Sequence, residues 1–450
     1  MSDSRHNFLA HTPVWKLLIQ LSAPATVGMI VGALYNIVDT IFVGRFVGTD
    51  AISALTVVFP FQLFVMAVAQ AIGMGGASII SRSLGARDED TGEKALGNII
   101  TMVFFSGAFF IAMAAIFMQP MLRLFGAQKE FIGLSTDYLR IVLPGNFLFI
   151  FTVALNNVIR AEGNARIAMF TMMVGAGLNM LLDPLFIYTF NMGIKGAAWA
   201  TLAGQISGFI FVFWFFLSKK SILHIRLSKM RLEKPIVRET LAMGAGAFVR
   251  QFAGSIIAVI INNLIAIHGS SVYIAAFGII HRLLSLLFMP LFGISQGLAP
   301  IVGYSYGAKN YHRARQAVML AIKWSTYISV AGFVIIMLFP HALMAVFSKD
   351  AELIERGAAV MRITCLAFPL LGVQIVGSVL FMATGKALPS FILSIARQIL
   401  FLLPMVLILS SVMGLKGIWY SFPLSDLLAF AVTVYMMLRE LNTFKSSDQH

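Results

Sequence analysis

The feature that most constrains this chain is a series of long apolar segments, each about as long as a helix that crosses a membrane. Such a helix needs about 20 apolar residues to cross a hydrocarbon core of roughly 30 Å. With 59% hydrophobic and 12% charged residues among 450, the chain is too apolar for a soluble globular protein. We therefore predict an all-α polytopic membrane protein. Its twelve predicted transmembrane helices are 14–42, 51–82, 95–118, 133–159, 167–190, 196–217, 236–267, 272–304, 313–340, 353–382, 387–411 and 417–438.

The placement of the basic residues predicts the orientation of the chain. The net charge is +14, and most of the 33 Lys and Arg residues precede the first span or lie in even-numbered loops. By the positive-inside rule, both termini are predicted to be cytoplasmic. The basic stretch 218–238 favours a cytoplasmic linker, in one form an amphipathic helix on anionic lipid. A nucleic-acid patch is the weaker alternative, and we expect no nucleic-acid partner. No cleavable signal segment is expected before the first span.

Comparing the chain with itself shows a repeat at a nearly constant offset. "SLGA" at 83–86 matches "SYGA" at 305–308, and "MGIKG" at 192–196 matches "MGLKG" at 413–417. One match of this kind would mean little, but an offset that persists over more than a hundred residues indicates duplication. A duplicated scaffold without transport is the alternative to a duplicated transporter.

The duplication predicts two six-helix lobes, 1–217 and 236–450, joined by the linker 218–235. Because six is even, equivalent residues of the two lobes emerge on the same side of the membrane. We predict lobes related by a pseudo-two-fold axis along the membrane normal, with alternating access between them.

Two acids, Asp39 and Asp183, lie inside otherwise apolar spans of the first half. A carboxylate inside a bilayer costs several kcal/mol unless it is paired, protonated or faces water, so each needs a role. On an α-helix Tyr35 and Asn36 share a face with Asp39, and Asn179 shares a face with Asp183. Oxygen ligands of this kind suit Na⁺, and a desolvated carboxylate readily takes up a proton. The pattern predicts a coupling-ion site for H⁺ or Na⁺; a buried structural acid is the alternative.

The second half carries charges of the opposite sign inside its spans. Arg397 and Asp426 are predicted to form a structural ion pair. Arg250 and Arg282 are candidates for a water-filled cavity that tunes which substrates enter. His281 titrates near neutral pH in one interpretation and is a hydrogen-bonded structural residue in the other.

Four segments together give the chain a family resemblance. They are "ALYNIVDTIFVG" (33–44), "IRAEGNARIAMF" (159–170), "LNMLLDPLF" (178–186) and "MGIKGAAWAT" (192–201). In these motifs and its duplicated plan the chain resembles the multidrug and toxic compound extrusion (MATE) family, most closely the DinF-like branch with its MepA-type multidrug exporters. The resemblance implies a transporter of the cell (inner) membrane, without enzymatic activity or cofactor. It implies antiport of cationic amphiphiles, drugs and dyes against H⁺ or Na⁺.

The resemblance also implies roles for particular residues. In this branch the cation site, including any Na⁺ site, falls on Asp39, Asn179, Asp183 and Thr201. An Asn of the fourth span near this site corresponds best to Asn156, and Pro24 matches a proline associated with bending of the first span. Where other branches carry acids in the second half, this chain has uncharged or basic residues, which argues against a second ion site. These residues are Arg250, Asn262, Asn263 and Gln374.

Three other functions are alternatives to antiport. A flippase for lipid-linked precursors would use the arginines of the second half to hold a diphosphate. An intramembrane enzyme would need a convergent catalytic set, and the eight histidines form no HExxH motif. A passive channel would need repeated filter glycines or rings of acids, which are absent. We expect a monomer whose only partners are membrane lipid and small-molecule cations.

Overall fold

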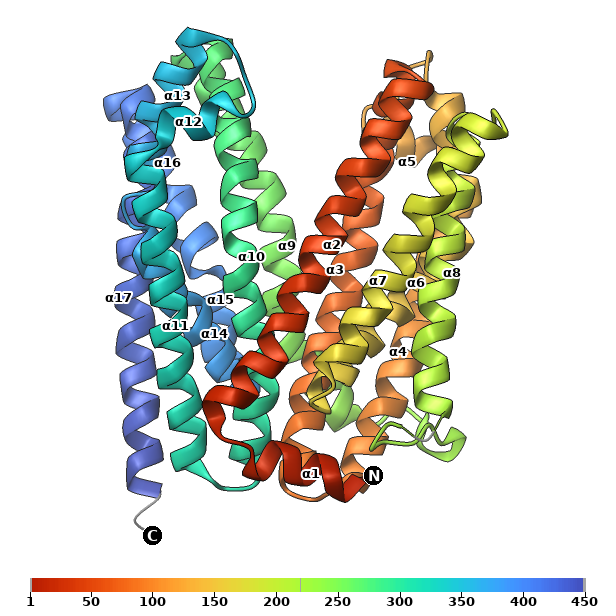
Figure 1. The fold of residues 1–450 in the computed structure, drawn as a ribbon, viewed down its shortest axis with the longest axis vertical. Helices are drawn as coiled ribbons and strands as arrows, with labels where there is room; N and C mark the ends of the chain where they lie inside the picture. Colours follow the sequence, from red (N-terminus) through yellow and green to blue (C-terminus); the bar gives the residue numbers. More distant parts are fainter. Residues whose placement is uncertain (1, 219, 448–450) are drawn as a thin grey trace. The chain divides into compact units, whose positions relative to one another are not determined.

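The structure, a computed structural model, describes residues 2–218 and 220–447, and the regular elements in that part of the chain are helices (Figure 1). Eleven helices there are long and apolar enough to cross a membrane, or twelve if one bent pair forms a single span. This confirms the all-α polytopic architecture predicted from the apolar segments. Ten of the eleven are α2 (Val14–Phe46), α3 (Thr49–Gly85), α4 (Glu89–Ile116), α6 (Ile132–Ala161), α7 (Ala165–Asp183), α8 (Ile194–Leu217), α9 (Lys234–His268), α10 (Ser271–Gly307), α11 (Tyr311–Leu338) and α17 (Leu415–Ser447), and the eleventh is the segment Ala387–Met413.

Shorter helices complete or connect these spans. They are α1 (Ser2–His11), α5 (Met118–Leu124), α12 (Pro340–Ala345), α13 (Ala351–Thr364), α14 (Leu371–Ala383), α15 (Ala387–Ile395) and α16 (Leu403–Met413). Two π-helical turns, η1 (Pro184–Thr189) and η4 (Ala396–Leu402), and two 3₁₀ turns, η2 (Leu227–Lys229) and η3 (Phe368–Leu370), interrupt the α-helical pattern.

The tenth predicted span is bent. Its two parts, α13 and the segment 368–383, meet at an angle of 45°. Between them α13 ends at Thr364 and η3 begins at Phe368. Pro369 lies within η3 and has no N–H to donate, so the α-helical hydrogen-bond ladder cannot run through this point.

The duplicated sequence produces the same local structure twice. Asp88 caps α4 by accepting a hydrogen bond from the Thr91 N–H at 3.0 Å, and Asn310 caps α11 by accepting one from the Arg313 N–H at 3.0 Å. The residue before each cap has a left-handed backbone, with φ of 56° at Arg87 and 57° at Lys309. A side chain that caps the N-terminus satisfies an N–H group that the helix leaves unpaired. The repeat therefore includes the turn between its second and third spans.

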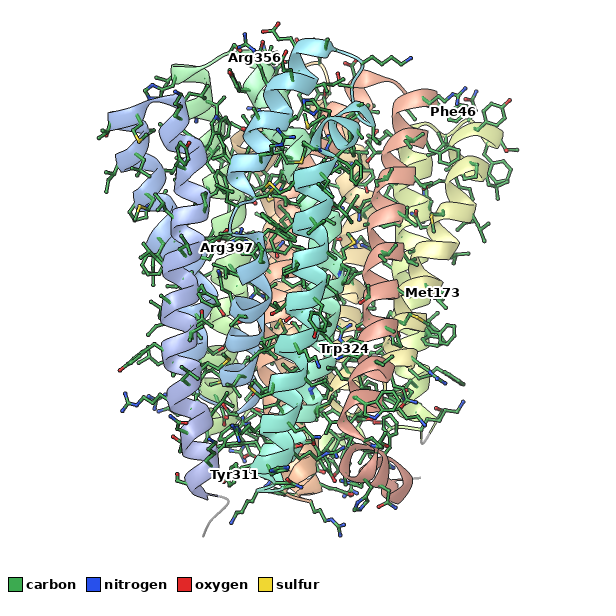
Figure 2. The ribbon with its side chains drawn as sticks, turned by 60° about the vertical axis from the view of Figure 1, so that its left-hand side comes forward. Phe46, Met173, Tyr311, Trp324, Arg356 and Arg397 are labelled. Carbon is green, nitrogen blue, oxygen red and sulfur yellow. The ribbon has the colours of Figure 1, made fainter. Side chains whose placement is uncertain are left out.

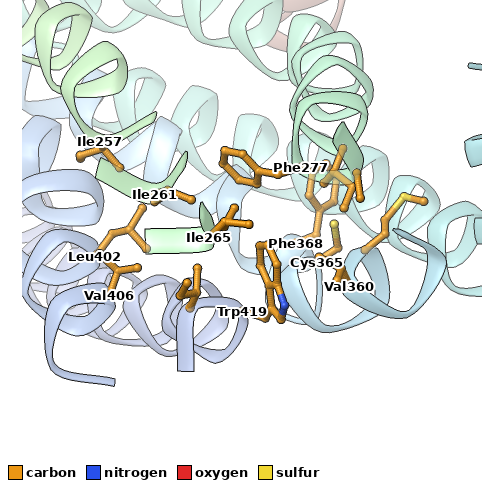
Figure 3. Close-up of a cluster of buried hydrophobic side chains, with 14 of the residues drawn as sticks. Ile257, Ile261, Ile265, Phe277, Val360, Cys365, Phe368, Leu402, Val406 and Trp419 are labelled. Atoms are coloured by element: carbon orange, nitrogen blue, oxygen red, sulfur yellow. The ribbon is translucent and has the colours of Figure 1, made fainter. Parts of the chain in front are cut away.

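The chain divides into two compact units, and two helices pass from one unit to the other. Unit 1 contains Met1–His11 and Pro24–Gly244, and unit 2 contains Thr12–Ala23 and Ala245–His450. Helices α2 and α9 therefore each begin in one unit and continue in the other. Within unit 1, α6 packs against α3, α4 and α8. Within unit 2, Figure 3 shows a buried apolar cluster to which α9, α10, α13, η4, α16 and α17 contribute side chains.

Glycines allow the first turns of α9 to lie directly against α3 in unit 1. A Cβ atom at Gly244 would lie 2.0 Å from the carbonyl oxygen of Ala71, and one at Gly75 would lie 2.0 Å from that of Thr240. The Arg82 guanidinium also donates to the Glu239 carboxylate at 2.5 Å. Only residues without a side chain permit this approach of two backbones.

A Gly244→Ala substitution is expected to destabilise unit 1 by about 1–3 kcal/mol, because the clash is with backbone that cannot rotate away. The measurement is the thermal unfolding midpoint of the purified protein in detergent. Gly177→Ala is the matched control, since nothing lies within 4 Å of a Cβ at that position. Equal midpoints for the two variants would contradict the close approach.

The basic linker is held against unit 1 by buried carboxylates. Glu162, fully buried at the end of α6, accepts hydrogen bonds from the Ser221 hydroxyl at 2.5 Å and from the backbone N–H groups of Ile222 and Leu223 at 3.1 and 3.3 Å. Glu93 of α4, 6% exposed, pairs with Lys229 at 2.6 Å. Within residues 220–233 the only helical element is the turn η2, and α9 begins at Lys234. The expectation of an amphipathic surface helix was therefore wrong, because hydrogen bonds and ion pairs to buried carboxylates fix this segment instead.

Candidate functional site

Helices α2, α7 and α8 of unit 1 bring the predicted cation-site residues together. Asp183 is fully buried, while Asn179 and Thr201 are 2% and 4% exposed. The Asn179 amide nitrogen lies 3.4 Å from the Thr201 hydroxyl, which joins α7 to α8. Asp39, half-buried on α2, lies close enough to Asp183 to interact with it electrostatically. Four residues that lie on three different helices thus form one polar cluster, which we call the acidic site.

The acidic site is rich in hydrogen-bond acceptors that have no donor. Both carboxylate oxygens of Asp183, one of Asp39 and the amide oxygen of Asn179 are buried without a partner among the described residues. A buried acceptor without a partner costs about 1–3 kcal/mol, and a charged one costs more. Two neighbouring carboxylates also repel each other when both are ionised. The arrangement is therefore suited to a bound cation, which would satisfy the oxygens and offset the charge.

Two tyrosines complete the polar surroundings. The hydroxyls of Tyr35 and Tyr138 lie within hydrogen-bonding reach of the Thr201 hydroxyl, and Tyr138 also reaches Gln62. Tyr35 was expected here from its helical spacing to Asp39. Tyr138 and Gln62 were not, because they lie on α6 and α3 and no local motif connects them to the acids. Their only signal in the sequence is a polar side chain inside an apolar span.

The helix that carries Asp183 changes its hydrogen-bonding pattern at that residue. The α-helix α7 ends at Asp183, and the π-helical turn η1 begins at Pro184. Proline cannot donate the backbone hydrogen bond that an α-helix needs at this position. π-Helical turns within longer helices frequently occur at functional sites. The helix is therefore irregular at Pro184, next to the fully buried acid.

Other predicted residues of unit 1 lie outside the acidic site. Asn36 is exposed, and its amide donates to the carbonyl of Gly32 in its own helix. The amide of Asn156 donates to the carbonyl of Ala168 at 2.8 Å. Ala168 precedes Asp183 by about four turns of α7, or roughly 22 Å, so the placement of Asn156 near the site was wrong. Pro24 lies inside α2, where the chain enters unit 1.

A different asparagine of α6 lies nearer to the acidic site. The amide oxygen of Asn146 accepts a hydrogen bond from the Gln205 amide at 3.2 Å. Gln205 lies one turn after Thr201 on α8, on the same face of the helix. The amide nitrogen of Asn146 and the amide oxygen of Gln205 are buried without a partner among the described residues. This pair extends the acidic site, and sequence reasoning missed it.

In unit 2 the structure pairs two of the predicted charges. The Arg397 Nε donates to a carboxylate oxygen of Asp426 at 2.6 Å, which confirms the predicted ion pair. His281 is close enough to Arg397 to interact with it electrostatically. Arg250 is half-buried, whereas the side chain of Arg282 is exposed. Of the site residues predicted in the second half, His281 thus lies near the Arg397–Asp426 pair, whereas Arg282 forms no hydrogen bond or ion pair with it.

The acidic site offers two carboxylates, one amide and one hydroxyl to a cation. Among the described residues no three His, Cys, Asp or Glu side chains gather as a metal-binding group. Carboxylate, amide and hydroxyl oxygens suit Na⁺, and the two carboxylates alone suit a proton. Either ion would be a substrate that binds and leaves.

Comparisons with known proteins agree with this architecture. The MatE family model matches residues 24–185 and matches again over 247–408. The same model thus covers both halves of the chain, as the internal repeat predicts. The multidrug export protein MepA of Staphylococcus aureus (strain MRSA252) is 24% identical over 451 residues, covering 100% of this chain and 99% of the relative. MepA of Staphylococcus saprophyticus is 25% identical over 450 residues, covering 99% of each.

Solved structures resemble the chain over nearly its whole length. The MATE multidrug transporter DinF-BH in complex with rhodamine 6G is 43% identical, with a TM-score of 0.88 and 97% of each chain covered. A multidrug resistance MATE family transporter in an outward-facing conformation is 27% identical, with a TM-score of 0.88, covering 97% of this chain and 98% of that one. The chain is therefore a multi-pass membrane protein that belongs to the multidrug and toxic compound extrusion (MATE) family, a family of transporters and not of enzymes.

Proposed function

We propose that this protein is a secondary active multidrug exporter, which moves lipophilic cationic drugs and dyes out of the cell in exchange for protons or Na⁺. It lies in the cell (inner) membrane with both termini in the cytoplasm. Two lobes alternate between inward-open and outward-open states, and binding of the ion at Asp39 and Asp183 favours release of the drug.

Family membership and the names of the relatives support this proposal. Two relatives that match the whole chain are called multidrug export proteins, and the related DinF-BH binds rhodamine 6G. The family model covers both halves of the chain. The similarity to MepA and DinF-BH supports export of more than one drug by this protein.

The observation that carries the ion-coupling part is the set of unpaired oxygens in the acidic site. Asp39, Asn179 and Asp183 together contribute four buried acceptor atoms without a donor among the described residues. A cation binds there when the site is closed around it and leaves when the site opens. Coupling requires only that ion and drug have different affinities for the two states of the transporter.

The test uses purified protein in proteoliposomes loaded with rhodamine 6G. A pH gradient and a Na⁺ gradient are imposed separately, and movement of the dye is followed by fluorescence. Dye movement that begins when one of the two gradients is imposed, and that is absent from protein-free liposomes, is the expected result and identifies the ion. No response to either gradient would overturn the proposed antiport.

A further inference from the structure

The Arg397–Asp426 pair leaves most of the guanidinium without a partner. Arg397 uses only its Nε for the hydrogen bond to Asp426. The two terminal nitrogens make no hydrogen bond to any other described residue, and the side chain is 31% exposed against 4% for Asp426. A guanidinium carries five N–H donors in a planar fork. Four of these donors are therefore available on the open side of Arg397.

The open side of Arg397 lies deep within a predicted span. The residue belongs to the candidate span Ala387–Met413, and Figure 2 shows it about halfway along the helices of unit 2. A charge at this depth is stable only where it faces water or a polar partner. Arg397 also lies in the π-helical turn η4, a type of turn that is frequent at functional sites. Beyond Asp426, the free donors therefore need water or a polar ligand as a partner at this depth.

A second arginine lies on the helix face that packs beside this turn. On α9, a Cβ at Gly246 would contact Ser394, and one at Gly254 would contact Gln398. Arg250 is midway between these glycines at a spacing of four residues, so it shares their face. Further along the same helix, Ile257 and Ile261 face Leu402 in Figure 3.

Arg250 and its surroundings contain further unpaired groups. Arg250 is half-buried and makes no hydrogen bond to another described residue. The amide oxygens of Gln374 and Gln398 are buried without a partner among the described residues. The Gln374 amide nitrogen donates to the backbone carbonyl of Asp426, which attaches it to the same cluster. The hydrogen-bond donors of Arg250 and the amide oxygens of Gln374 and Gln398 could therefore be paired by water or by a bound ligand.

The charge of these residues and a nearby aromatic ring indicate which kind of ligand could bind beside Arg397. The side-chain charges of Arg250, Arg397 and Asp426 add up to one positive charge. The Arg397 guanidinium lies 5.3 Å from the ring centroid of Phe288, whose ring packs at 5.7 Å against Phe368. A planar fork of N–H groups binds a carboxylate through two parallel hydrogen bonds. A monoanion would neutralise this cluster, whereas a phosphate dianion would leave surplus negative charge inside the membrane.

We propose that unit 2 contains an anion-binding site, in which Arg397 and Arg250 bind the carboxylate of an aromatic organic anion or zwitterion beside Phe288. The side chains of this site carry a net positive charge, whereas those of the acidic site of unit 1 carry a negative charge when ionised. It is also not inherited from the duplication, because Gly175 and Gln205 occupy the positions of Arg397 and Asp426 in the first half. The proposal does not rest on drug export, because binding at the site can be measured without a gradient.

The experiment measures equilibrium binding of radiolabelled 2-naphthoate to the full-length protein in phosphatidylcholine nanodiscs. We expect saturable binding that 2-naphthamide, the neutral analogue, does not displace. Asp426→Asn frees the guanidinium from its carboxylate and is expected to tighten binding about tenfold, whereas Arg397→Gln combined with Asp426→Asn is expected to weaken it about tenfold below the parent. Arg439→Gln, at an exposed arginine of α17, is expected to leave binding unchanged.

The opposite effects of the single and double variants separate a binding site from a structural ion pair. If the pair is only structural, Asp426→Asn and the double variant bind 2-naphthoate equally, and the proposal fails. Absence of saturable binding to the parent protein also overturns it. If the double variant does not remain monodisperse, Arg250→Gln replaces it, with weaker binding expected and unchanged binding contradicting the proposal.

Two further arms identify the source of the anion. Added chloride or inorganic phosphate that displaces 2-naphthoate at equal concentration would overturn the assignment to an aromatic carboxylate. Phosphatidylglycerol nanodiscs test whether a lipid phosphate fills the site, and loss of binding in them would likewise overturn it. Retained binding in all these arms is the expected outcome.

Discussion

In an Asp183→Asn variant, ion-driven export of rhodamine 6G is expected to fall to the level of protein-free liposomes. Asp183 is fully buried, and neither of its carboxylate oxygens has a donor among the described residues. The substitution keeps the shape of the side chain but removes its charge and places an NH₂ donor among acceptors. The site then loses most of its attraction for a proton or Na⁺, so the gradient no longer drives exchange.

The measurement is the initial rate of dye movement under the gradient that drives the parent protein. Asp50→Asn is the matched control, because Asp50 is an exposed acid at the start of α3. We expect its rate to equal that of the parent. Because an isosteric change should leave folding intact, the elution profile and unfolding midpoint of Asp183→Asn are expected to match the parent. Full ion-driven export by Asp183→Asn would disprove the ion-coupling role of the acidic site.

A Glu162→Ala substitution is expected to release the linker from unit 1. The carboxylate accepts one hydroxyl and two backbone hydrogen bonds from residues 221–223. Buried donors left without an acceptor cost about 1–3 kcal/mol each, so we expect a loss of stability on the order of 4 kcal/mol. Release of the segment into water would relieve part of that cost, which is why the linker should detach.

Limited trypsin digestion measures this release directly, since the linker contains Arg226, Lys229 and Arg231. We expect faster cleavage in the linker of Glu162→Ala, together with a lower unfolding midpoint. Glu130→Ala, which removes an exposed acid of the same unit, serves as the control and should behave as the parent. Identical digestion rates for the two variants would show that Glu162 does not hold the linker.

Sequence reasoning succeeded where the physical cause is local. The spans follow from the apolar length that a bilayer requires, and the structure gives eleven or twelve candidate spans near the predicted positions. The repeated caps Asp88 and Asn310 follow from short segments that are similar in the two halves. The pairing of Arg397 with Asp426 was also predicted correctly. A span holds few charges, and a charge inside a membrane is stabilised by pairing with one of opposite sign.

Sequence reasoning failed where a residue's position along its helix decides whether it reaches the acidic site. Asn156 was chosen because it lies in the correct span, but it lies on α6 about 18 residues, or roughly 27 Å, beyond Tyr138. Tyr138 interacts with Thr201, whereas Asn156 binds the backbone near the start of α7. Asn146, which lies closer to the acidic site, carried no motif that distinguished it.

By itself, the sequence determined the all-α class, the approximate positions of the spans, the duplication, and the presence of acids in the first half and arginines in the second. These depend on composition and spacing over a few turns. Only the tertiary structure decided which polar groups share a site, that α2 and α9 each begin in one unit and continue in the other, and that Glu162 anchors the linker. Such contacts join residues far apart in the chain, so they depend on how whole helices pack, which no local pattern specifies.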